Sequence, residues 1–283
     1  MATWNLDWLS LRPAGDPALP PDVIRRNPTD FAHLARYAAH LDADIVGLQE
    51  VDTPAAAALI FPKPEYRVIL TDDAIPQHVG IAVRRGIDVQ INPELKALDV
   101  APPGALHHLR GGLDVTLHDH TGGPDLRILV IHLKSGCWDR PLKERGYSCP
   151  ILREQFAILD DWVLQRQDEG VAFAVMGDFN RRLTAADPLM QELEADAPMT
   201  LTTSGRANPC WGGNYFIDHI LLGNDARQWL RADSLRVMLF HPAADEEKAR
   251  LSDHCPVSVR LNLPARETGS AVTPAGGDAR GRG

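Results

Sequence analysis

Short apolar segments recur along the whole chain, and only two long stretches carry the repeat of an amphipathic helix. We expect these helices over residues 29–42, with Thr29 or Asp30 as the cap, and over residues 151–166. The other apolar segments predict strands at 2–8, 44–51, 66–70, 79–84, 87–91, 113–118, 126–133, 171–176, 215–222, 235–240 and 257–261, and shorter helices near 54–61 and 188–195. Adjacent strands with helices between them predict an α/β fold of two sheets packed face to face, with the helices outside.

The length of 283 residues fits one large domain, which we place at residues 1–263. The Gly-, Ala- and Arg-rich segment 264–283 is expected to be a disordered tail. No apolar run approaches the roughly 20 residues of a membrane span, so we expect no stable membrane insertion. A monomer is the expected state of the chain. No signal peptide is visible, which predicts a cytoplasmic protein; secretion stays open if the start is truncated.

The charge balance is acidic, because 29 Lys and Arg stand against 38 Asp and Glu and leave a net charge of −9. A chain of this charge is not drawn nonspecifically to DNA, RNA or an anionic membrane. Binding of a phosphate-rich partner would therefore need a local basic site or a metal ion. The balance argues against a histone-like DNA binder but not against a metal enzyme that acts on phosphates.

The four cysteines do not form the dense pattern of a disulfide scaffold, and none belongs to a CxxC pair. They are Cys137, Cys149, Cys210 and Cys255. Reduced thiols are the expectation for all four. Cys137 and Cys149 bracket one polar loop, which a disulfide would close in an oxidising compartment.

Acids, amides and histidines stand at or near the ends of several predicted strands. They are Asn5, Glu50, His132, Asp178, Asn180, Asp218, His219, Asp253 and His254. Taken one at a time, each fits an ordinary turn, a cap or a solvated strand end. Their recurrence favours a shared site, because a carboxylate at the end of an apolar strand is costly to bury unless it is paired or binds a metal.

The residue types at these strand ends suit metal-assisted chemistry on a phosphate. Carboxylate and amide oxygens are preferred by Mg²⁺, and histidines with an Asp/Asn pair can handle protons and stabilise an oxyanion. A Gly-rich phosphate loop, a HExxH motif and a GxSxG motif are all absent from the sequence. Their absence argues against ATP-driven chemistry, zinc proteolysis and the serine-hydrolase fold.

Several short blocks around these residues follow one another in a specific order: Thr3-Trp4-Asn5-Leu6, Leu48-Gln49-Glu50-Val51, Ile131-His132-Leu133, Gly177-Asp178-Phe179-Asn180, Ile217-Asp218-His219-Ile220 and Ser252-Asp253-His254. In this order the chain resembles the endonuclease/exonuclease/phosphatase superfamily, which includes deoxyribonuclease I, exonuclease III, neutral sphingomyelinases and inositol polyphosphate 5-phosphatases. The resemblance covers nearly the whole chain. It implies a deoxyribonuclease I-like four-layer α/β sandwich, with two mixed sheets and the site at one end of them.

The resemblance also implies a metal site. Glu50 would be the principal ligand, helped by Asn5 and by Asp253. Mg²⁺ is the expected ion, with Mn²⁺ as the alternative.

The catalytic roles follow from the same resemblance. Asp178, oriented by Asn180, would position or deprotonate the attacking water. His254, held by Asp218, would contact the scissile phosphate and stabilise its developing charge. His132 would lie on the other side of the phosphate, as a phosphate ligand or as the proton donor to the leaving oxygen. Together these roles meet the needs of in-line phosphoryl hydrolysis.

A histidine at position 132 is similar to the deoxyribonuclease I and sphingomyelinase branch, because exonuclease III-like members use a tyrosine-type device there. Deoxyribonuclease I-like enzymes place a glutamate in an earlier strand to orient this histidine. Here the nearest candidates are Gln77 and His78. A glutamine carbonyl would fix the tautomer of His132 without raising its pKa as a carboxylate would.

Three loops are expected to border the site and to contribute Lys134, Arg110 and Trp211 to substrate binding. The loop at 134–147 mixes four cations with two aromatic residues, which fits either a phosphate-tracking loop or a solvated loop with one packed ring. Arg110 stands where deoxyribonuclease I-like enzymes use an arginine on phosphate. Trp211 would stack on a base or close the core.

These observations predict a divalent-metal-dependent hydrolase of phosphodiester bonds, most simply an endo- or exonuclease whose partner is nucleic acid. The alternative is a phosphatase or phosphodiesterase that acts on a small-molecule, inositol or lipid phosphate with the same site. A non-catalytic binding module is the third hypothesis, and it is disfavoured because every principal catalytic position is occupied.

Overall fold

Two six-stranded sheets lie at the centre of the computed structural model, which describes residues 1–102, 104–118, 123–144, 148–210, 213–241, 247 and 249–264. The first sheet has the order β13-β14-β1-β2-β4-β3. Its strands are β1 (Ala2–Leu9), β2 (Ile45–Val51), β3 (Tyr66–Leu70), β4 (His78–Arg84), β13 (Arg236–Val237) and β14 (Val257–Ser258). β1 and β2 are parallel, whereas the other pairs described in this sheet are antiparallel.

The second sheet has the order β5-β6-β7-β8-β12-β9. Its strands are β5 (Asp88–Ile91), β6 (Leu113–His118), β7 (Leu126–His132), β8 (Phe173–Asp178), β9 (Met199–Leu201) and β12 (Asp218–Gly223). β7 and β8 are parallel, and β12 runs antiparallel to β8. A short hairpin of β10 (Ala207–Asn208) and β11 (Asn214–Tyr215) lies outside both sheets.

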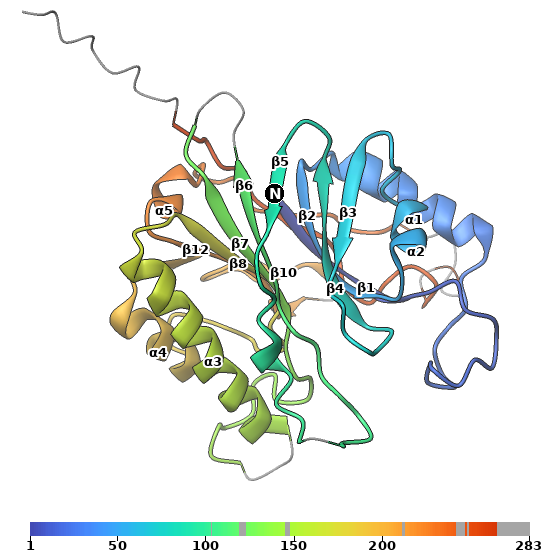
Figure 1. The fold of residues 1–283 in the computed structure, drawn as a ribbon, viewed down its shortest axis with the longest axis horizontal. Helices are drawn as coiled ribbons and strands as arrows, with labels where there is room; N and C mark the ends of the chain where they lie inside the picture. The colour runs from blue at the N-terminus through green and yellow to red at the C-terminus, as the bar shows by residue number, and fades with distance from the viewer. Residues whose placement is uncertain are drawn as a thin grey trace, which may run out of the picture.

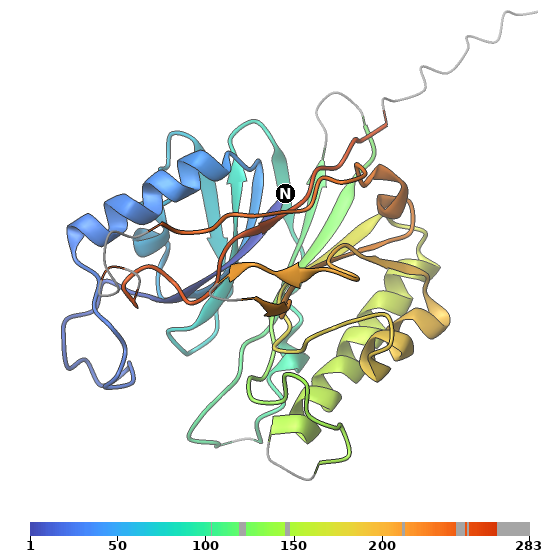
Figure 2. The same ribbon diagram turned by 180° about the vertical axis from the view of Figure 1, so that it is seen from behind.

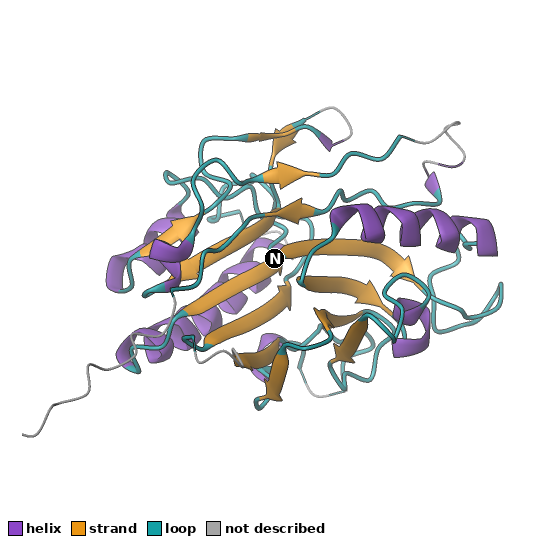
Figure 3. Ribbon diagram, turned by 90° about the horizontal axis from the view of Figure 1, so that it is seen from above, coloured by secondary structure: helices purple, strands orange, loops and turns teal. Residues whose placement is uncertain are grey.

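Helices cover the outer faces of the two sheets (Figures 1 and 3). They are α1 (Pro28–Leu41), α2 (Pro54–Ala58), α3 (Ser148–Asp168), α4 (Pro188–Asp196) and α5 (Ala226–Trp229), with a 3-10 turn at Lys96–Leu98. One core packs α1 against β1 and β2, and a second packs α3 against β7 and β8. A third core joins β4 to β7, β8 and β12 between the sheets. This arrangement confirms the predicted four-layer sandwich.

The predicted cap of the first helix and the predicted strand at 215–222 were wrong, and the elements expected at 54–61, 235–240 and 257–261 are shorter, at 54–58, 236–237 and 257–258. α1 is capped by Asn27, whose side chain accepts from the backbone N–H groups of Thr29 and Asp30. Pro28 suits the first helical position because it has no N–H to satisfy, so the cap stands one residue before it. The strand expected at 215–222 is divided between β11 and β12.

Both pairs of cysteines are bonded, Cys137 with Cys149 and Cys210 with Cys255, so the expectation of reduced thiols was wrong. Their Cα atoms lie 5.0 and 5.9 Å apart, inside the range that a disulfide can span. The sequence separation of the second pair is 45 residues, and only the fold brings these two cysteines together. The first disulfide ties the loop after β7 to α3, and the second ties the segment before β11 to the segment before β14.

Two expectations concern the chain ends and membranes. The segment predicted to be a disordered tail, 264–283, lies outside the described residues apart from Pro264. None of the helices in the described part of the chain combines the length and apolar character needed to cross a bilayer.

Figure 2 shows the last described strands, β13 and β14, crossing the face opposite to the view of Figure 1.

Candidate active site

The polar residues predicted from the strand ends meet at one edge of the sandwich. Asn5 of β1 pairs with Gln49, which precedes Glu50 of β2, and His132 of β7 lies opposite Asp178 of β8. Because β12 is antiparallel to β8, its first residue, Asp218, also lies opposite Asp178. The parallel pairs and the reversed β12 therefore bring these side chains to the same end of both sheets.

Asn5 joins the two sheets at this edge. Its Nδ2 donates to Glu50 Oε1 at 3.1 Å and to Asp178 Oδ2 at 3.2 Å. Its Oδ1 accepts from the backbone N–H of Asp7 at 2.9 Å. One amide thus holds carboxylates from different sheets at a defined spacing.

β1 and β2 of the first sheet depart from regular pairing where they enter the site. β1 shifts register between Asn5 and Leu9, and β2 shifts opposite β4 between Leu48 and Val51. Asp7, Trp8 and Glu50 have positive φ values of 45°, 54° and 60°. The backbone N–H of Trp8 then donates to Glu50 Oε2 at 3.2 Å. Such bulges re-aim side chains, and strained backbone of this kind is concentrated at functional sites.

Asn180 supports Asp178 with two hydrogen bonds. Its backbone N–H donates to Asp178 Oδ1 at 2.8 Å, and its Nδ2 donates to Asp178 Oδ2 at 3.2 Å and to Leu133 O at 3.0 Å. Asn180 adopts a φ of 50°, a conformation that asparagine tolerates well. Burial, reinforced by Asp218 and Glu50 and opposed by His254, raises the pKa of Asp178 to about 7.

His254 and Asp218 form a charged pair next to Asp178. His254 Nδ1 lies 2.8 Å from Asp218 Oδ2, and its Nε2 lies 3.7 Å from Asp178 Oδ2. Burial alone would lower the pKa of His254, but the carboxylates of Asp218 and Asp178 outweigh burial and hold the pKa well above its ordinary value. His254 is therefore an imidazolium whose Nε2 faces the carboxylates of Asp178 and Asp253.

Possible ligand atoms of Asp178, Asp218 and His254 all lie within 4.8 Å of one another, which would also allow a metal ion. An imidazolium has no lone pair to offer a metal. The hydrogen bond between His254 and Asp218 therefore favours charge and proton handling for this pair, and leaves Glu50 and its neighbours as the better metal ligands.

His132 is buried and contacts Arg110. Arg110 Nη2 lies 2.9 Å from His132 Nδ1 and 2.8 Å from His132 Nε2, while His132 Nε2 is 3.6 Å from Asp178 Oδ2. Burial, and then the charge of Arg110, lower the pKa of His132 well below its ordinary value, so the ring is neutral. Among the hydrogen bonds of the described residues, neither Gln77 nor His78 reaches this ring. The side chain that contacts the His132 ring is instead that of Arg110.

The other residues expected at the site differ in position. Arg110 is nearly buried, and its Nε has no hydrogen-bond partner among the described atoms. Lys134 is half-buried, and burial, with the charge of Arg110, lowers the pKa of its ammonium group. Asp253 is largely exposed, with Oδ1 3.8 Å from His254 Nε2. Trp211 lies outside the described residues.

The sequence patterns did not identify two residues that lie at the site, Asp7 and Trp138. Burial and the carboxylate of Asp253 raise the pKa of Asp7 to about 6, which places Asp7 in the acidic group with Glu50. Strand alternation does not indicate Asp7, because β1 shifts register after Asn5 and Asp7 has a positive φ. Trp138 donates from Nε1 to Asn180 Oδ1 at 3.2 Å, and no sequence spacing indicates this contact.

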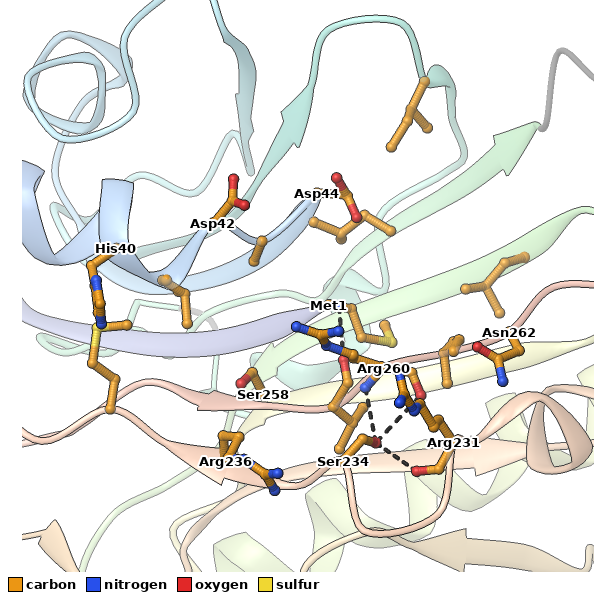
Figure 4. Close-up of a pocket in the computed structure, with 18 of the residues that line it drawn as sticks. Met1, His40, Asp42, Asp44, Arg231, Ser234, Arg236, Ser258, Arg260 and Asn262 are labelled. Carbon is orange, nitrogen blue, oxygen red and sulfur yellow. Dashed lines mark hydrogen bonds between the residues drawn. The ribbon is translucent and has the colours of Figure 1, made fainter.

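A cavity of about 1460 Å³ opens at the other ends of the same strands (Figure 4). It is lined by Met1, which precedes β1, and by Asp44 and Ile45 at the start of β2. It also contains Arg231 and Arg260. The cavity and the polar cluster therefore lie at opposite ends of β1 and β2.

A known protein family matches the sequence over most of its length. A sequence profile described as the Endonuclease/Exonuclease/phosphatase family matches residues 2–254. A search of curated protein sequences found no significant match.

Solved structures resemble the whole fold at low sequence identity. Truncated Caenorhabditis elegans TDP2 is 15% identical with a TM-score of 0.59, covering 92% of this chain and 96% of that one. The Neisseria 3′ phosphatase NExo, bound to a product DNA hairpin, is 19% identical with a TM-score of 0.60, covering 92% and 98%. The human Nocturnin catalytic domain with bound sulfate is 14% identical with a TM-score of 0.58, covering 84% and 88%. Since the family profile spans most of the chain, the protein belongs to the endonuclease/exonuclease/phosphatase family.

Proposed function

We propose that the protein is a divalent-metal-dependent phosphodiesterase that cleaves nucleic acid. The observation that carries this proposal is the surroundings of Asp178 Oδ2. It lies 3.7 Å from His254 Nε2 and 3.6 Å from His132 Nε2, and Asn5 connects it to Glu50. A base, a cation and an acidic ligand group thus face one small volume, as in-line hydrolysis of a phosphodiester requires.

The donor set fits a hard divalent cation. Glu50 supplies carboxylate oxygens, and Asn5 Oδ1 keeps a lone pair beyond the one that accepts from Asp7. Burial, and then the carboxylates of Asp253 and Glu50 against the charge of Arg26, raise the pKa of Asp7, so three carboxyl groups lie near one another where a cation could bind. Glu50, Asn5 and Asp253 would hold Mg²⁺ or Mn²⁺, with Asp7 beside them. When bound, the ion would supply Lewis-acid stabilisation of the phosphate.

The protein's own groups divide the remaining work. Ionised Asp178, with both oxygens held by Asn180, accepts a proton from the attacking water. The His254 imidazolium, kept charged by Asp218, stabilises negative charge that develops on the phosphate. Neutral His132 offers one N–H to a phosphate oxygen, and adjacent Arg110 supplies positive charge. Of the two roles implied for His132, this environment favours the phosphate ligand.

Nucleic acid is the favoured substrate class because similar folds have been solved with DNA. NExo was bound to a product DNA hairpin, and Danio rerio TDP2, 19% identical to this chain, was complexed with a single-strand DNA product. The net charge of −9 favours the second candidate, a small-molecule, inositol or lipid phosphate, because a small ester needs no extended cationic surface.

A substrate panel separates the two candidates. We expect cleavage of single-stranded or double-stranded DNA or of RNA in Mg²⁺, with a rate that falls as salt rises and is abolished by EDTA. Turnover of a phosphoinositide or sphingomyelin without cleavage of any polynucleotide would replace the first candidate with the second. Full activity in EDTA would contradict metal dependence.

Substitutions at the site test the residue assignments on the substrate that this panel identifies. Glu50→Ala and Asp178→Asn should each lower kcat at least about 100-fold while the protein remains folded, because each removes a group that acts in the transition state. Glu194→Ala and Asp161→Asn are matched controls at exposed helix positions and should retain activity. Near wild-type turnover in either site variant would contradict the assignment.

A further inference from the structure

The loop that follows β7 is fastened to the segment that follows β8. The backbone N–H of Arg182 donates to Trp138 O at 2.8 Å. Nη1 of the buried Arg181 donates to the carbonyl oxygens of Cys137 and Arg140, each at 2.8 Å. These bonds hold Trp138 directly beside the catalytic cluster.

Trp138 is 43% exposed, yet its polar edge points inward to the 3.2 Å contact with Asn180 Oδ1. Packing in the core therefore does not account for the orientation of this ring. The N–H contact and the backbone bonds on either side of Trp138 do account for it.

The contact with Trp138 acts with two acceptors on the other side to set which way the Asn180 amide is turned. An indole N–H can only donate, so Asn180 must present its oxygen to Trp138. The amide nitrogen then faces Asp178 Oδ2 at 3.2 Å and Leu133 O at 3.0 Å, and both of these atoms accept. If the amide turned over, its oxygen would face two acceptors and its NH₂ group would face the indole N–H. Every polar group in this set is satisfied in one orientation only.

We propose that Trp138 is a positioning residue for hydrolysis. Its indole N–H fixes the Asn180 amide so that Nδ2 donates to Asp178, and this hydrogen bond aims the carboxylate that activates the water. The inference rests on the proposed function, because it assumes that Asp178 is the base. Trp138 itself touches no reacting atom in this role.

The substitution Trp138→Phe tests the inference because it keeps an aromatic ring and removes the N–H. We expect kcat to fall about tenfold and KM to change less than about twofold, since a misaligned base weakens only the transition state. A rise in KM with unchanged kcat would show that Trp138 only contacts substrate, and would overturn the proposal.

A double-mutant cycle sharpens the result. Asn180→Ala should lower kcat more than Trp138→Phe does. Adding Trp138→Phe to Asn180→Ala should then cause no further loss, because the amide that the indole orients is already gone. Independent, multiplying losses would overturn the proposal.

Trp162→Phe is the matched control. It removes an indole hydrogen bond of similar length, 2.9 Å from Trp162 Nε1 to Asp114 Oδ2, on a helix outside the site. Its kcat should equal that of the wild type. A loss of kcat equal to that of Trp138→Phe would attribute the effect to general destabilisation and overturn the proposal.

A readout without turnover separates this inference from the proposed function. In protein with ¹⁵N-labelled tryptophan, the indole signal that Trp138→Phe removes should show slowed hydrogen exchange in the wild type. Exchange should become faster in Asn180→Ala. Fast exchange in the wild type would overturn the contact, whatever the substrate. A protected indole in a protein that cleaves no phosphate ester would overturn the proposed function while leaving the contact in place.

Discussion

At the level of single residues, Gly177 shows how tightly the site is built. It has a φ of 149°, and a Cβ added there would lie 1.9 Å from Ile131 O on the neighbouring parallel strand. Only glycine lets β8 approach β7 closely enough for Asp178 to lie opposite His132. The block Gly177-Asp178-Phe179-Asn180 thus combines a chemical group with the backbone that positions it.

Gly177→Ala should therefore lower the free energy of unfolding by more than about 2 kcal/mol and abolish most activity, because β7 and β8 must separate. Gly170→Ala is the control: its φ is also positive, at 67°, but a Cβ there meets no atom within 4 Å. It should cost about 1 kcal/mol and leave kcat unchanged. Urea unfolding of both variants checks this expectation, and equal losses would contradict the steric argument.

The residues of the candidate site could be listed from the sequence because they stand at or near the ends of apolar strands. Their order along the chain then gave the resemblance that implies their roles. Trp138 and Asp7 could not be assigned in this way. The contact of Trp138 with Asn180 depends on a loop conformation set by Arg181 and Arg182. Neither the contact of Trp138 nor the position of Asp7 at the site leaves a periodic pattern in the sequence.

At the level of elements, β12 is held in place by a buried histidine. His219 Nε2 donates to Arg181 O at 3.0 Å, and Nδ1 accepts from the Thr203 hydroxyl at 2.6 Å. Both bonds require a neutral ring with its proton on Nε2. Burial, opposed by the hydrogen bond to Arg181 O, lowers the pKa of His219 from 6.5 to about 4.

This shift makes stability depend on pH in a defined direction. Between about pH 6.5 and 4 the unfolded chain binds a proton at His219 that the native state does not, so unfolding becomes easier as pH falls. The stabilisation is complete above pH 6.5 and decreases by as much as about 3 kcal/mol by pH 4. Urea unfolding of the wild type and of His219→Gln across this range should give curves that converge at low pH. Parallel curves would contradict the assignment.

The register shifts in β1 and β2 belong to the same scale, and the sequence pattern did not predict them. Residues 2–8 and 44–51 were expected as regular strands, and their bounds nearly match β1 and β2. The shifts depend on pairing between strands about thirty to forty residues apart, which local propensity does not encode. They are nevertheless what turns Glu50 towards Asn5.

At the level of the whole molecule, the disulfides connect loops that border the site. Cys210–Cys255 ties the segment before β11 to the residue after His254, and Cys137–Cys149 closes the loop that carries Trp138. Loop entropy gives these bonds about 3 kcal/mol for the separation of 12 and about 4 kcal/mol for the separation of 45.

Reduction should therefore lower the thermal unfolding midpoint, and Cys210→Ser with Cys255→Ser should lower it more than Cys137→Ser with Cys149→Ser. Thermal scans with and without a phosphine reductant measure this order. Peptide mapping without reduction should recover both linkages, and free thiols at all four positions would contradict the pairing.

The sequence by itself determined the fold class, the ordered set of strand-end residues and the family, because apolar periodicity and short motifs are local properties of the chain. The tertiary structure decided the partners: Arg110 against His132, Trp138 against Asn180, and Cys210 bonded to Cys255. These contacts join residues from 22 to 45 positions apart, and they form only when strand register, bulges and loop anchors place the groups within bonding distance.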